Sequence, residues 1–401
     1  MGVDPVVSIL SLNSGSSSLK FALYKAEPAD ETLQASGAVE RIGLAQGHLW
    51  VRGADGGRSL LLERKEDFSD HEAAVAAVFG AAARLRLPEP SAVGHRVVHG
   101  GPHHSAPERV DAGLLADLRA LVPLAPLHLP AAVAGIEAVA ARFPDLPQAA
   151  CFDTAFHRGM PELAQRFALP GALWEAGVRR YGFHGLSYEY VLDALGDAAR
   201  GRVVIAHLGN GASMAAVRDG APVDTTMGFT PAGGFMMGTR SGDLDPGILI
   251  YLMRQHGCGA DEVERLVIRE AGLLGVSGLS PDMKTLLEAG EQNLQAALAV
   301  DLFCYHARKH VGALAAALGG LDTLVFTGGI GERAAPVRRQ ICEGLAHLGI
   351  ELDPERNQAH AGTISTPRSP CAVRVIPTDE DLMIARHTRR LFFPRSSRAG
   401  E

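Results

Sequence analysis

Lysine, cysteine and tryptophan are scarce in this chain of 401 residues, which contains five lysines, five cysteines and two tryptophans. The net charge of -7 and the shortage of lysine argue against nucleic acid as the main partner, because phosphate backbones require a basic face. The cysteines are odd in number, widely spaced and never arranged as Cys-x-x-Cys, which favours buried free thiols over a disulfide framework or a zinc site. Small anionic substrates stay possible, since they need only a local group of arginines.

Long apolar runs are also absent, and no stretch approaches the roughly 20 residues that a membrane helix needs. The segment Met1–Pro5 has neither a basic start nor an apolar core, and Val6 stands where a myristoylation signal requires Ser or Thr. We therefore expect a cytoplasmic protein without a membrane segment. The arginine-rich tail from Arg395 is expected to be frayed.

The length exceeds the size at which one hydrophobic core usually stops growing, which favours two domains or a duplicated architecture. Val6–Leu12 and Leu19–Tyr24 are two strand-like runs separated by a Ser/Gly turn. Half a chain later, Val203–Leu208, Ser213–Val217 and Val223–Met227 repeat the strand-turn-strand pattern. We expect two related halves that face a shared cleft.

Alanine-rich segments with helical periodicity lie between the strands, and this alternation predicts an α/β fold. Near the end of the chain, a buried strand at Leu324–Thr327 is expected to run into a glycine-rich loop at Gly328–Gly331 and then into a helix. The expected helices are Asp111–Leu121, Ala131–Phe143, Ser187–Leu195, Ala260–Glu270 and Gln292–Leu318.

Two turns are candidates for phosphate binding. The segment Asn13–Lys20 combines a glycine, consecutive hydroxyls and a lysine, so it can offer N–H groups, O–H donors and a cation to phosphate, although a polar β-turn is an alternative. A Walker A loop is excluded because the chain has no Gly-Lys pair. Gly209–Gly211 resembles the start of a dinucleotide fingerprint, but Met214 replaces the third glycine, so a phosphate-binding or ordinary hairpin fits better.

Several loops carry side chains suited to a ligand. Arg96 lies in a His/Gly-rich segment whose Gly-Gly-Pro break argues against zinc, and its planar fork can hold a carboxylate or a phosphoryl group. Asp153 lies in an otherwise apolar run, where it needs a metal, an arginine or a helix N-terminus. His184 and Arg240 are flanked by glycines, which suits access to a ligand, although each alone is also compatible with a structural role.

Together these segments resemble the acetate kinase family, within the superfamily of acetate and sugar kinases, Hsp70 and actin. The resemblance covers about Val6 to Leu391, and its seven motifs are NSGSSSLK (13–20), HRVVHGG (95–101), FDTAFH (152–157), YGFHG (181–185), HLGNGAS (207–213), DTTMGFTP (224–231) and MMGTRSGD (236–243).

The resemblance implies a duplicated α/β fold of the RNase H type with an active-site cleft between two domains. An N-terminal acyl- and phosphate-binding domain would comprise 1–152 plus 382–401, and a C-terminal nucleotide-binding and dimerisation domain would comprise 153–381. ATP and acetate would be the substrates, magnesium or manganese the metal cofactor, and the homodimer the assembly.

The same resemblance assigns catalysis, acetate binding and metal binding to particular residues. Arg96 is shared between catalysis and acetate binding. The implied residues are Arg96, Asp153, His184 and Arg240 for catalysis, Val98, Leu127, Phe183 and Pro231 for the apolar acetate pocket, and Asn13 and Glu380 for the metal.

Nucleotide binding is implied for residues of both halves, with Ser16 and Ser18 in the phosphate loop. The implied ATP-binding residues are Lys20, His207, Leu208, Gly209, Asn210, Gly211, Asp282, Met283, Lys284, Gly329, Ile330, Gly331, Glu332 and Arg333.

Acetate is ionised at pH 7, like a side-chain carboxyl with a pKa of about 4, so the nucleophile needs no base. Catalysis should therefore consist of positioning and charge neutralisation around a phosphoryl group transferred in line. We expect Asp153 to order the metal or its water rather than to abstract a proton.

Some positions depart from the family pattern, and they concern acyl and donor preference. A propionate or butyrate kinase, a pyrophosphate-using enzyme and a non-catalytic nucleotide switch are therefore the alternatives, although a switch would have no use for Arg96, His184 and Arg240 together. The departures are Leu129 for Asn, Tyr188 for His, Ala232-Gly233 for Leu-Glu, Lys284 for Arg, Arg333 for Asn and Asp381 for Glu.

Overall fold

The first motif forms a tight hairpin in the computed structural model, which describes residues 7–27, 30–55 and 58–394. β1 (Val7–Gly15) and β2 (Ser18–Ala26) pair continuously, so only two residues turn the chain and the loop is shorter than predicted. Asn13 and Lys20 are direct partners across this ladder and therefore project from the same face. The expected strand start at Val6 and the tail from Arg395 lie outside the described residues.

The hairpin belongs to an eight-stranded sheet with the order β5-β4-β3-β2-β1-β6-β8-β7. β1 pairs in parallel with β6, and β6 pairs in parallel with β8, whereas β2 to β5 continue the antiparallel side. The further strands are β3 (Glu31–Glu40), β4 (His48–Gly53), β5 (Leu60–Lys65), β6 (Ala92–Val97), β7 (Glu108–Arg109) and β8 (Gln148–Phe152).

The second, five-stranded sheet has the order β11-β10-β9-β12-β13. β9, β10 and β11 are antiparallel, and β9, β12 and β13 are parallel, which repeats the order of the first sheet around β1. The predicted α/β class and duplication are therefore confirmed. The strands are β9 (Arg202–Leu208), β10 (Ala212–Arg218), β11 (Ala221–Thr225), β12 (Thr323–Thr327) and β13 (Ala372–Val375).

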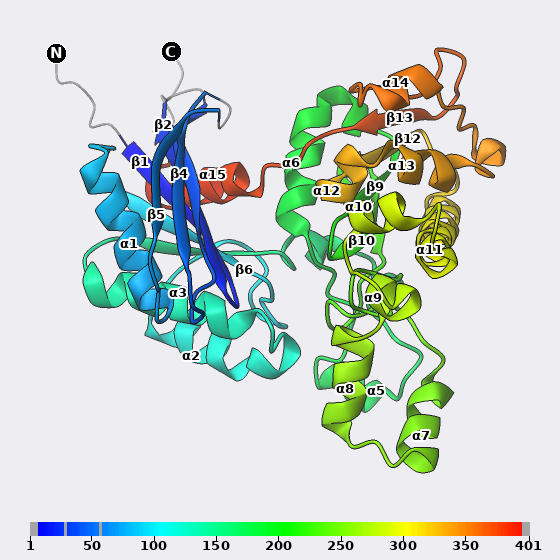
Figure 1. Cartoon of the computed structure of the whole chain (residues 1–401), viewed down its shortest axis with the longest axis horizontal. Helices are drawn as coiled ribbons and strands as arrows, with labels where there is room; N and C mark the ends of the chain where they lie inside the picture. Colours follow the sequence, from blue (N-terminus) through cyan, green and yellow to red (C-terminus); the bar gives the residue numbers. More distant parts are fainter. Residues whose placement is uncertain (1–6, 28–29, 56–57, 395–401) are drawn as a thin grey trace. The chain divides into compact units, whose positions relative to one another are not determined.

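Helices cover both faces of the first sheet (Figure 1). Leu10 and Leu12 of β1 pack with residues of α1 (His71–Arg84) and α3 (Leu129–Arg142), whereas Ile9 packs with Ala385 of α15 (Glu380–Phe392). This alternation places Ser11 and Asn13 on the α15 side. The remaining helices here are α2 (Ala112–Ala120) and the 3-10 helix Val122–Leu124.

The long helix α11 (Leu294–Leu318) packs against β9, β10 and β11 of the second sheet. Asn293 caps its N-terminus, and Gly319 ends it in the left-handed conformation. The other helices are α4 (Glu162–Gln165), α5 (Gly171–Glu175), α6 (Gly185–Leu195), α7 (Pro246–Gln255), α8 (Ala260–Arg269), α9 (Gly272–Ser277), α10 (Met283–Ala289), α12 (Gly328–Arg333), α13 (Ala335–Cys342), α14 (Pro354–Gln358) and the 3-10 helices Phe156–Gly159, Gly196–Ala199 and Ala346–Leu348.

All five predicted helices are confirmed, with ends that differ by a few residues. The glycine-rich loop predicted at Gly328–Gly331 is wrong, because α12 begins directly after β12. Gly328 makes this junction possible with a φ of +75°. A Cβ at this position would lie 2.7 Å from the carbonyl oxygen of Leu208.

The chain divides into two compact units, Met1–Phe156 with Asp379–Glu401, and His157–Thr378. These boundaries fall a few residues from the predicted ones, because Asp153 remains hydrogen-bonded to Val97 beside β8 and because α15 begins with Glu380. The chain crosses between the units twice. After β8 it continues through short helices into α6 of the second unit, and after β13 it returns to the first unit as α15.

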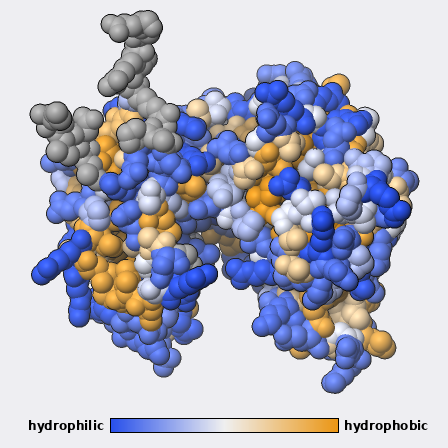
Figure 2. Space-filling model, turned by 90° about the horizontal axis from the view of Figure 1, so that it is seen from above, coloured by the Kyte–Doolittle hydropathy of each residue, from blue (hydrophilic) through white to orange (hydrophobic). Residues whose placement is uncertain are grey.

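The visible surface is mainly hydrophilic, with hydrophobic residues gathered in patches (Figure 2). Within the described ranges, no helix combines the length and hydropathy of a membrane span. Four of the free cysteines are buried as expected, and Cys258 is half-buried.

Candidate active site

Arg96 is the centre of a partly buried ion-pair cluster in the first unit. It lies near the end of β6, and its Nε and Nη2 donate to the carboxylate of Asp153 at 2.7 to 3.1 Å. Its Nη1 lies 3.4 Å from Oε2 of Glu380. Burial alone would lower the pKa of the Arg96 guanidinium, but the two carboxylates outweigh burial and raise that pKa.

The parallel pairing of β6 and β8 explains how Arg96 and Asp153 meet. Val97 is the register partner of Phe152, and the Asp153 N–H donates to the Val97 carbonyl. Both side chains therefore emerge where neighbouring parallel strands end, which is where ligands usually bind in α/β sheets. Asp153 is fully buried and is satisfied by an arginine, one of the partners that the sequence required.

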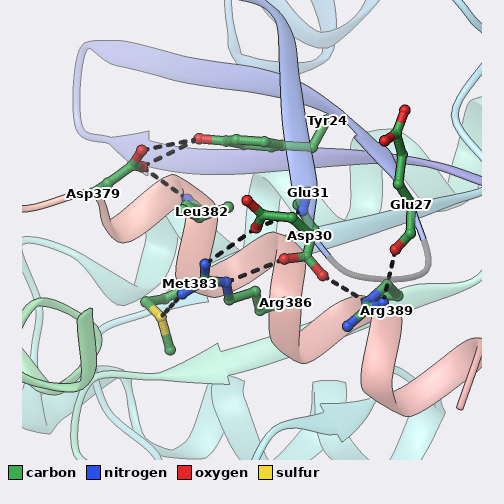
Figure 3. A network of polar contacts seen from close by, with 9 residues as sticks. All are labelled: Tyr24, Glu27, Asp30, Glu31, Asp379, Leu382, Met383, Arg386 and Arg389. Carbon is green, nitrogen blue, oxygen red and sulfur yellow. Dashed lines mark hydrogen bonds and ion pairs between the residues drawn. The ribbon is translucent and has the colours of Figure 1, made fainter. Parts of the chain in front are cut away.

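The third member of the cluster, Glu380, is the first residue of α15, and acidic residues lie on both sides of it. Asp379 caps the helix by accepting from the Leu382 N–H, and the Tyr24 hydroxyl donates to Asp379 at 3.2 Å (Figure 3). Asp381 accepts from Ser11 Oγ at 2.9 Å, and burial raises the pKa of Asp381 to about 6. Four carboxylates, those of Asp153, Asp379, Glu380 and Asp381, therefore lie in this part of the first unit.

Further along α15, buried ion pairs fix the helix to β3 (Figure 3). The Glu31 side chain is only 2% exposed. One of its oxygens lies 2.6 Å from Arg389 Nε and the other 3.1 Å from Arg386 Nε. Because a buried carboxylate needs such partners, this network determines where α15, and hence Glu380, lies along the sheet.

Asn13 lies on the α15 face of β1, two residues beyond Ser11. Its ladder partner Lys20 lowers the pKa of Asp381, although burial has the larger, opposite effect. Asn13, Lys20 and the acidic end of α15 therefore belong to one region of the first unit. Ser16 is exposed at the turn and Ser18 is half-buried.

Two stacked histidines form the centre of the second unit's candidate residues. The rings of His184 and His207 lie 4.2 Å apart at an angle of 15°. His184 Nδ1 is 2.8 Å from Ser213 Oγ, which also contacts the Tyr188 hydroxyl. His207 Nδ1 is 2.8 Å from Ser187 Oγ. Each imidazole is thereby held in one orientation by a hydroxyl.

Arg240 also lies beside the Gly209–Gly211 turn. A Cβ on Gly211 would lie 3.0 Å from Arg240 Nη2 and 3.5 Å from His184 Nε2, so a side chain there would crowd the guanidinium. Arg240 Nη1 donates to the Pro231 carbonyl at 2.7 Å, and burial lowers the Arg240 pKa to about 10. Across the described residues, Arg240 forms no ion pair with a carboxylate.

A pocket of about 640 Å³ opens beside the same turn. The predicted ATP-binding residues that it brings together come from the turn, from α10 and from α12. A larger groove of about 1000 Å³, at the C-terminal ends of α1 and α3, has none of the predicted site residues in its lining. The pocket beside the turn is lined by Gly209, Asn210, Pro281, Asp282, Met283, Lys284, Leu287, Gly329, Ile330, Arg333, Ala334 and Pro336.

Other predicted residues lie apart from this pocket. Gly331 is buried and Glu332 contacts backbone amides, so neither lines the pocket. Of the predicted methyl pocket, Val98 and Leu127 are half-buried residues of the first unit. In the second unit Pro231 is half-buried, but Phe183 is only 1% exposed and packs in the interior.

Sequence reasoning missed the groups that orient these residues. Ser11, Ser187 and Glu31 are ordinary strand or helix residues, and only tertiary packing brings them to Asp381, His207 and α15. The sequence offers one indication for Glu31. It is a charged residue at the start of a strand with many buried residues, and a buried charge needs a partner of opposite charge.

The profile of the acetokinase family matches residues 8–386. The chain belongs to the acetokinase family. A curated relative, the acetate kinase of Rhodopseudomonas palustris, is 51% identical over 394 residues, which cover 96% of this chain and 98% of the relative. The resemblance inferred from the seven motifs is therefore confirmed.

Solved structures of the acetokinase family have the same fold. The acetate kinase of Porphyromonas gingivalis gives a TM-score of 0.86 at 40% identity and covers 96% of this chain and 99% of its own. A propionate kinase from Francisella tularensis gives a TM-score of 0.90 at 36% identity and covers 96% and 100%. The predicted fold class is confirmed by these neighbours.

Proposed function

We propose that the chain is an acetate kinase, which reversibly transfers the γ-phosphoryl group of ATP to acetate and gives acetyl phosphate and ADP. The observation that carries this proposal is the group of Arg240, His184 and the Gly211 turn beside the pocket of the second unit. The acetate kinase of R. palustris, 51% identical over nearly the whole chain, supports the same activity.

The side chains suit a reaction in which two anions must meet. Arg240 has no carboxylate partner among the described residues, so its charge is available to an anionic substrate. His184 adds an imidazole whose Nδ1 is occupied by Ser213 and whose Nε2 lies towards Gly211. These groups would neutralise charge on the transferring phosphoryl group, and acetate needs no general base.

Binding of ATP is assigned to the 640 Å³ pocket of the second unit. The adenosine would lie between α10, at Asp282–Lys284, and α12, at Gly329–Arg333. The Gly209–Gly211 turn, with little side-chain bulk, would let the phosphates approach the backbone. The predicted cleft, in which residues of both units act on one phosphoryl group, is part of this proposal.

The first unit supplies oxygen donors that fit magnesium or manganese. Asn13, Asp153 and Glu380 are hard ligands, and the described residues contain no cluster of three His, Cys, Asp or Glu side chains that would form a complete cage. Mg²⁺ typically uses one or two carboxylates together with phosphate oxygens and water, so this sparse set suits a nucleotide-bound ion. Such an ion would neutralise charge on the phosphates when bound.

Asp153 is proposed to order the metal or its water. The Arg96 guanidinium stabilises the charged carboxylate that a metal ligand requires, and an already ionised acetate needs no proton acceptor. Asp153→Asn should lower kcat, weaken the apparent affinity for magnesium and leave the pH dependence of the remaining activity unchanged. A lost general-base limb in the pH–rate profile, with magnesium affinity intact, would contradict this role.

The acyl pocket is assigned to Val98, Leu127 and Pro231, and Phe183 would pack behind them because its side chain is only 1% exposed. Arg96 would hold the acetate carboxylate by exchanging one of its contacts to Asp153 or Glu380. One or two methylenes change binding by only about 1–3 kcal/mol, so propionate and butyrate are the natural competitors of acetate. The chain is 36% identical to the propionate kinase of F. tularensis and 51% identical to the acetate kinase of R. palustris, which favours acetate.

A hydroxamate assay tests the proposal directly. Purified protein with magnesium is offered acetate, propionate or butyrate, and ATP, GTP or pyrophosphate as donor. The expected result is the highest kcat/KM for acetate with ATP. Binding of ATP without any acyl hydroxamate would support a nucleotide switch instead, and a preference for pyrophosphate or a longer acid would reassign donor or acceptor.

The proposal includes a cytoplasmic homodimer that forms through the second unit. α7 and α8 bury none of their residues, and Ile248, Ile250 and Tyr251 of α7 are each more than two-fifths exposed. Such an apolar face is suited to a second copy of the chain. Light scattering should give a dimer for the wild type and a monomer for Tyr251→Glu, whereas a monomeric wild type would contradict the assembly.

A further inference from the structure

Glu332 belongs to the predicted nucleotide segment but does not line the pocket. Its Oε1 accepts hydrogen bonds from the Gly328 N–H at 3.1 Å and from the Thr378 N–H at 3.2 Å. Gly328 is the first residue of α12, which forms one wall of the pocket. Thr378 is the last residue before Asp379, the N-cap of α15. Oε1 of Glu332 therefore connects α12 to the segment that precedes α15.

α12 is well placed to transmit a local ordering because both of its ends contact neighbouring residues closely. Its start packs against Leu208, as the 2.7 Å limit at Gly328 shows. At its other end, the fully buried Arg338 donates to the carbonyl oxygens of Gly331 at 2.8 Å and Glu332 at 2.9 Å. Closely packed interiors are hardly compressible, so a contact made at one part of α12 is felt at the others.

The segment before α15 has few other backbone bonds. The Ile376 N–H donates to the Phe326 carbonyl, but Pro377 has no N–H to donate. The Thr378 hydroxyl is buried without a hydrogen-bond partner in the described part of the chain. The bond from the Thr378 amide to Glu332 is thus the contact that fixes this segment just before Asp379 and Glu380.

We propose that Glu332 is a positioning residue that couples occupation of the pocket to the position of the Thr378–Glu380 segment. This inference rests on the proposed function, in which the pocket binds adenosine and Glu380 belongs to the metal site. Nucleotide that packs against Gly329 and Ile330 stabilises α12, and Glu332 passes this order to the Thr378 amide. Nucleotide and metal then favour each other's binding, and by linkage the effect is reciprocal.

Amide hydrogen exchange at Gly328 and Thr378 tests the link in the full-length protein without nucleotide. Glu332→Ala should accelerate exchange at both amides by about tenfold, because each loses a hydrogen bond to a charged acceptor. Glu332→Gln keeps an acceptor oxygen and should stay close to the wild type. The Ile376 amide, bonded to Phe326, is an internal reference that should not change. Glu332→Asp, too short to reach both N–H groups, replaces the alanine variant if that variant does not fold.

Addition of ADP tests the coupling. Exchange at Thr378 should slow in the wild type and in Glu332→Gln but not in Glu332→Ala. The apparent KM for magnesium should rise about five- to tenfold in Glu332→Ala and be restored in Glu332→Gln. Arg333→Ala, which shortens a side chain that lines the pocket, should raise the KM for ATP while the response of Thr378 to saturating ADP persists.

Two results would overturn the inference: unchanged Thr378 exchange in Glu332→Ala without nucleotide, or an equal response to ADP in that variant. A wild type that binds no ADP by calorimetry would count against the proposed function instead. The comparison without nucleotide would still decide whether Glu332 fixes Thr378.

Discussion

The first hairpins of the two units share a topology and differ in chemistry. In the first unit, β1 and β2 are joined by two residues, and the polar side chains Asn13 and Lys20 project from the strands. In the second unit, β9 and β10 are joined by Gly209–Gly211, and the turn has no bulky side chain at either end. The same strand order therefore presents polar strand side chains at the hairpin of the first unit and exposed backbone at the hairpin of the second.

The arginines differ in the same way. Arg96 of the first unit is neutralised by Asp153 and Glu380, whereas Arg240 of the second contacts a carbonyl and no carboxylate within the described ranges. The first unit therefore has an excess of carboxylates that suits a cation, and the second has a cation that suits an anion. Under the proposed function, the metal would therefore be held by residues of the first unit and the phosphoryl group would be contacted by Arg240 of the second.

Removal of the Arg240 guanidinium should have the largest effect. Arg240→Ala is expected to lower kcat by about 10³-fold or more, the range seen when an arginine that stabilises transferring phosphoryl charge is removed. Arg240→Lys should recover only part of this loss, because an ammonium cannot form the bidentate fork. Steady-state kinetics measure the effect, with thermal melting as the folding control. A kcat within tenfold of the wild type would mean that Arg240 is structural.

The buried arginine of the second unit should dominate stability. Arg338 donates to the Asn357 side chain and to three backbone carbonyl oxygens. Arg338→Met leaves these acceptors buried and unpaired, at an expected cost of about 3–5 kcal/mol in the free energy of unfolding. The exposed Arg339→Met is the matched control and should change it by less than about 0.5 kcal/mol. Equal denaturation midpoints for both variants would refute this assignment.

Each unit contains a fully buried histidine whose pKa is lowered by burial, and this similarity predicts a shared acid sensitivity. Burial lowers the pKa of His95 and of His157 from 6.5 to about 4. The unfolded chain therefore binds more protons between these pH values, and stability is lost as the pH falls from 6.5 towards 4. Each histidine contributes a slope of about 1.4 kcal/mol per pH unit in this window.

His95→Gln should remove one such contribution, so urea unfolding between pH 7 and pH 5 should show a flatter dependence than in the wild type. The exposed His103→Gln, in the same unit, should leave the slope unchanged. Parallel pH dependences for wild type and His95→Gln would show that other groups cause the acid sensitivity.

The smallest effect is expected at Tyr188, whose hydroxyl shares Ser213 Oγ with His184. Tyr188→Phe removes one of two contacts to this hydroxyl, so kcat should fall by about five- to tenfold, equivalent to roughly 1 kcal/mol. Ser213→Ala removes both contacts and should cost more. Wild-type kinetics for Tyr188→Phe would show that Tyr188 does not contribute to the orientation of His184.

Much of this architecture was accessible from the sequence. Hydrophobic periodicity located the helices, the hairpins at Asn13 and Gly209 predicted the duplication, and the seven motifs predicted the family. Periodicity missed α12, because glycines that usually mark a loop here continue directly from β12 into a helix.

The orienting contacts were not accessible, because they join residues far apart in the chain. Ser11 meets Asp381, and Glu31 meets Arg386, only after α15 has packed on the sheet. No local pattern records such a pairing. The sequence likewise does not show that Phe183 packs in the interior, since an aromatic residue in a glycine-flanked motif suits a pocket wall equally well.

The return of the chain to the first unit as α15 also has a consequence for synthesis on the ribosome. Gly94 of β6 faces α15 so closely that a Cβ there would lie 2.2 Å from Thr388 Oγ1, and Glu31 depends on Arg386 and Arg389. All of these partners are translated after the entire second unit. The first unit, although it begins the chain, is therefore the last to be completed, and a nascent chain must keep one face of its sheet uncovered until then.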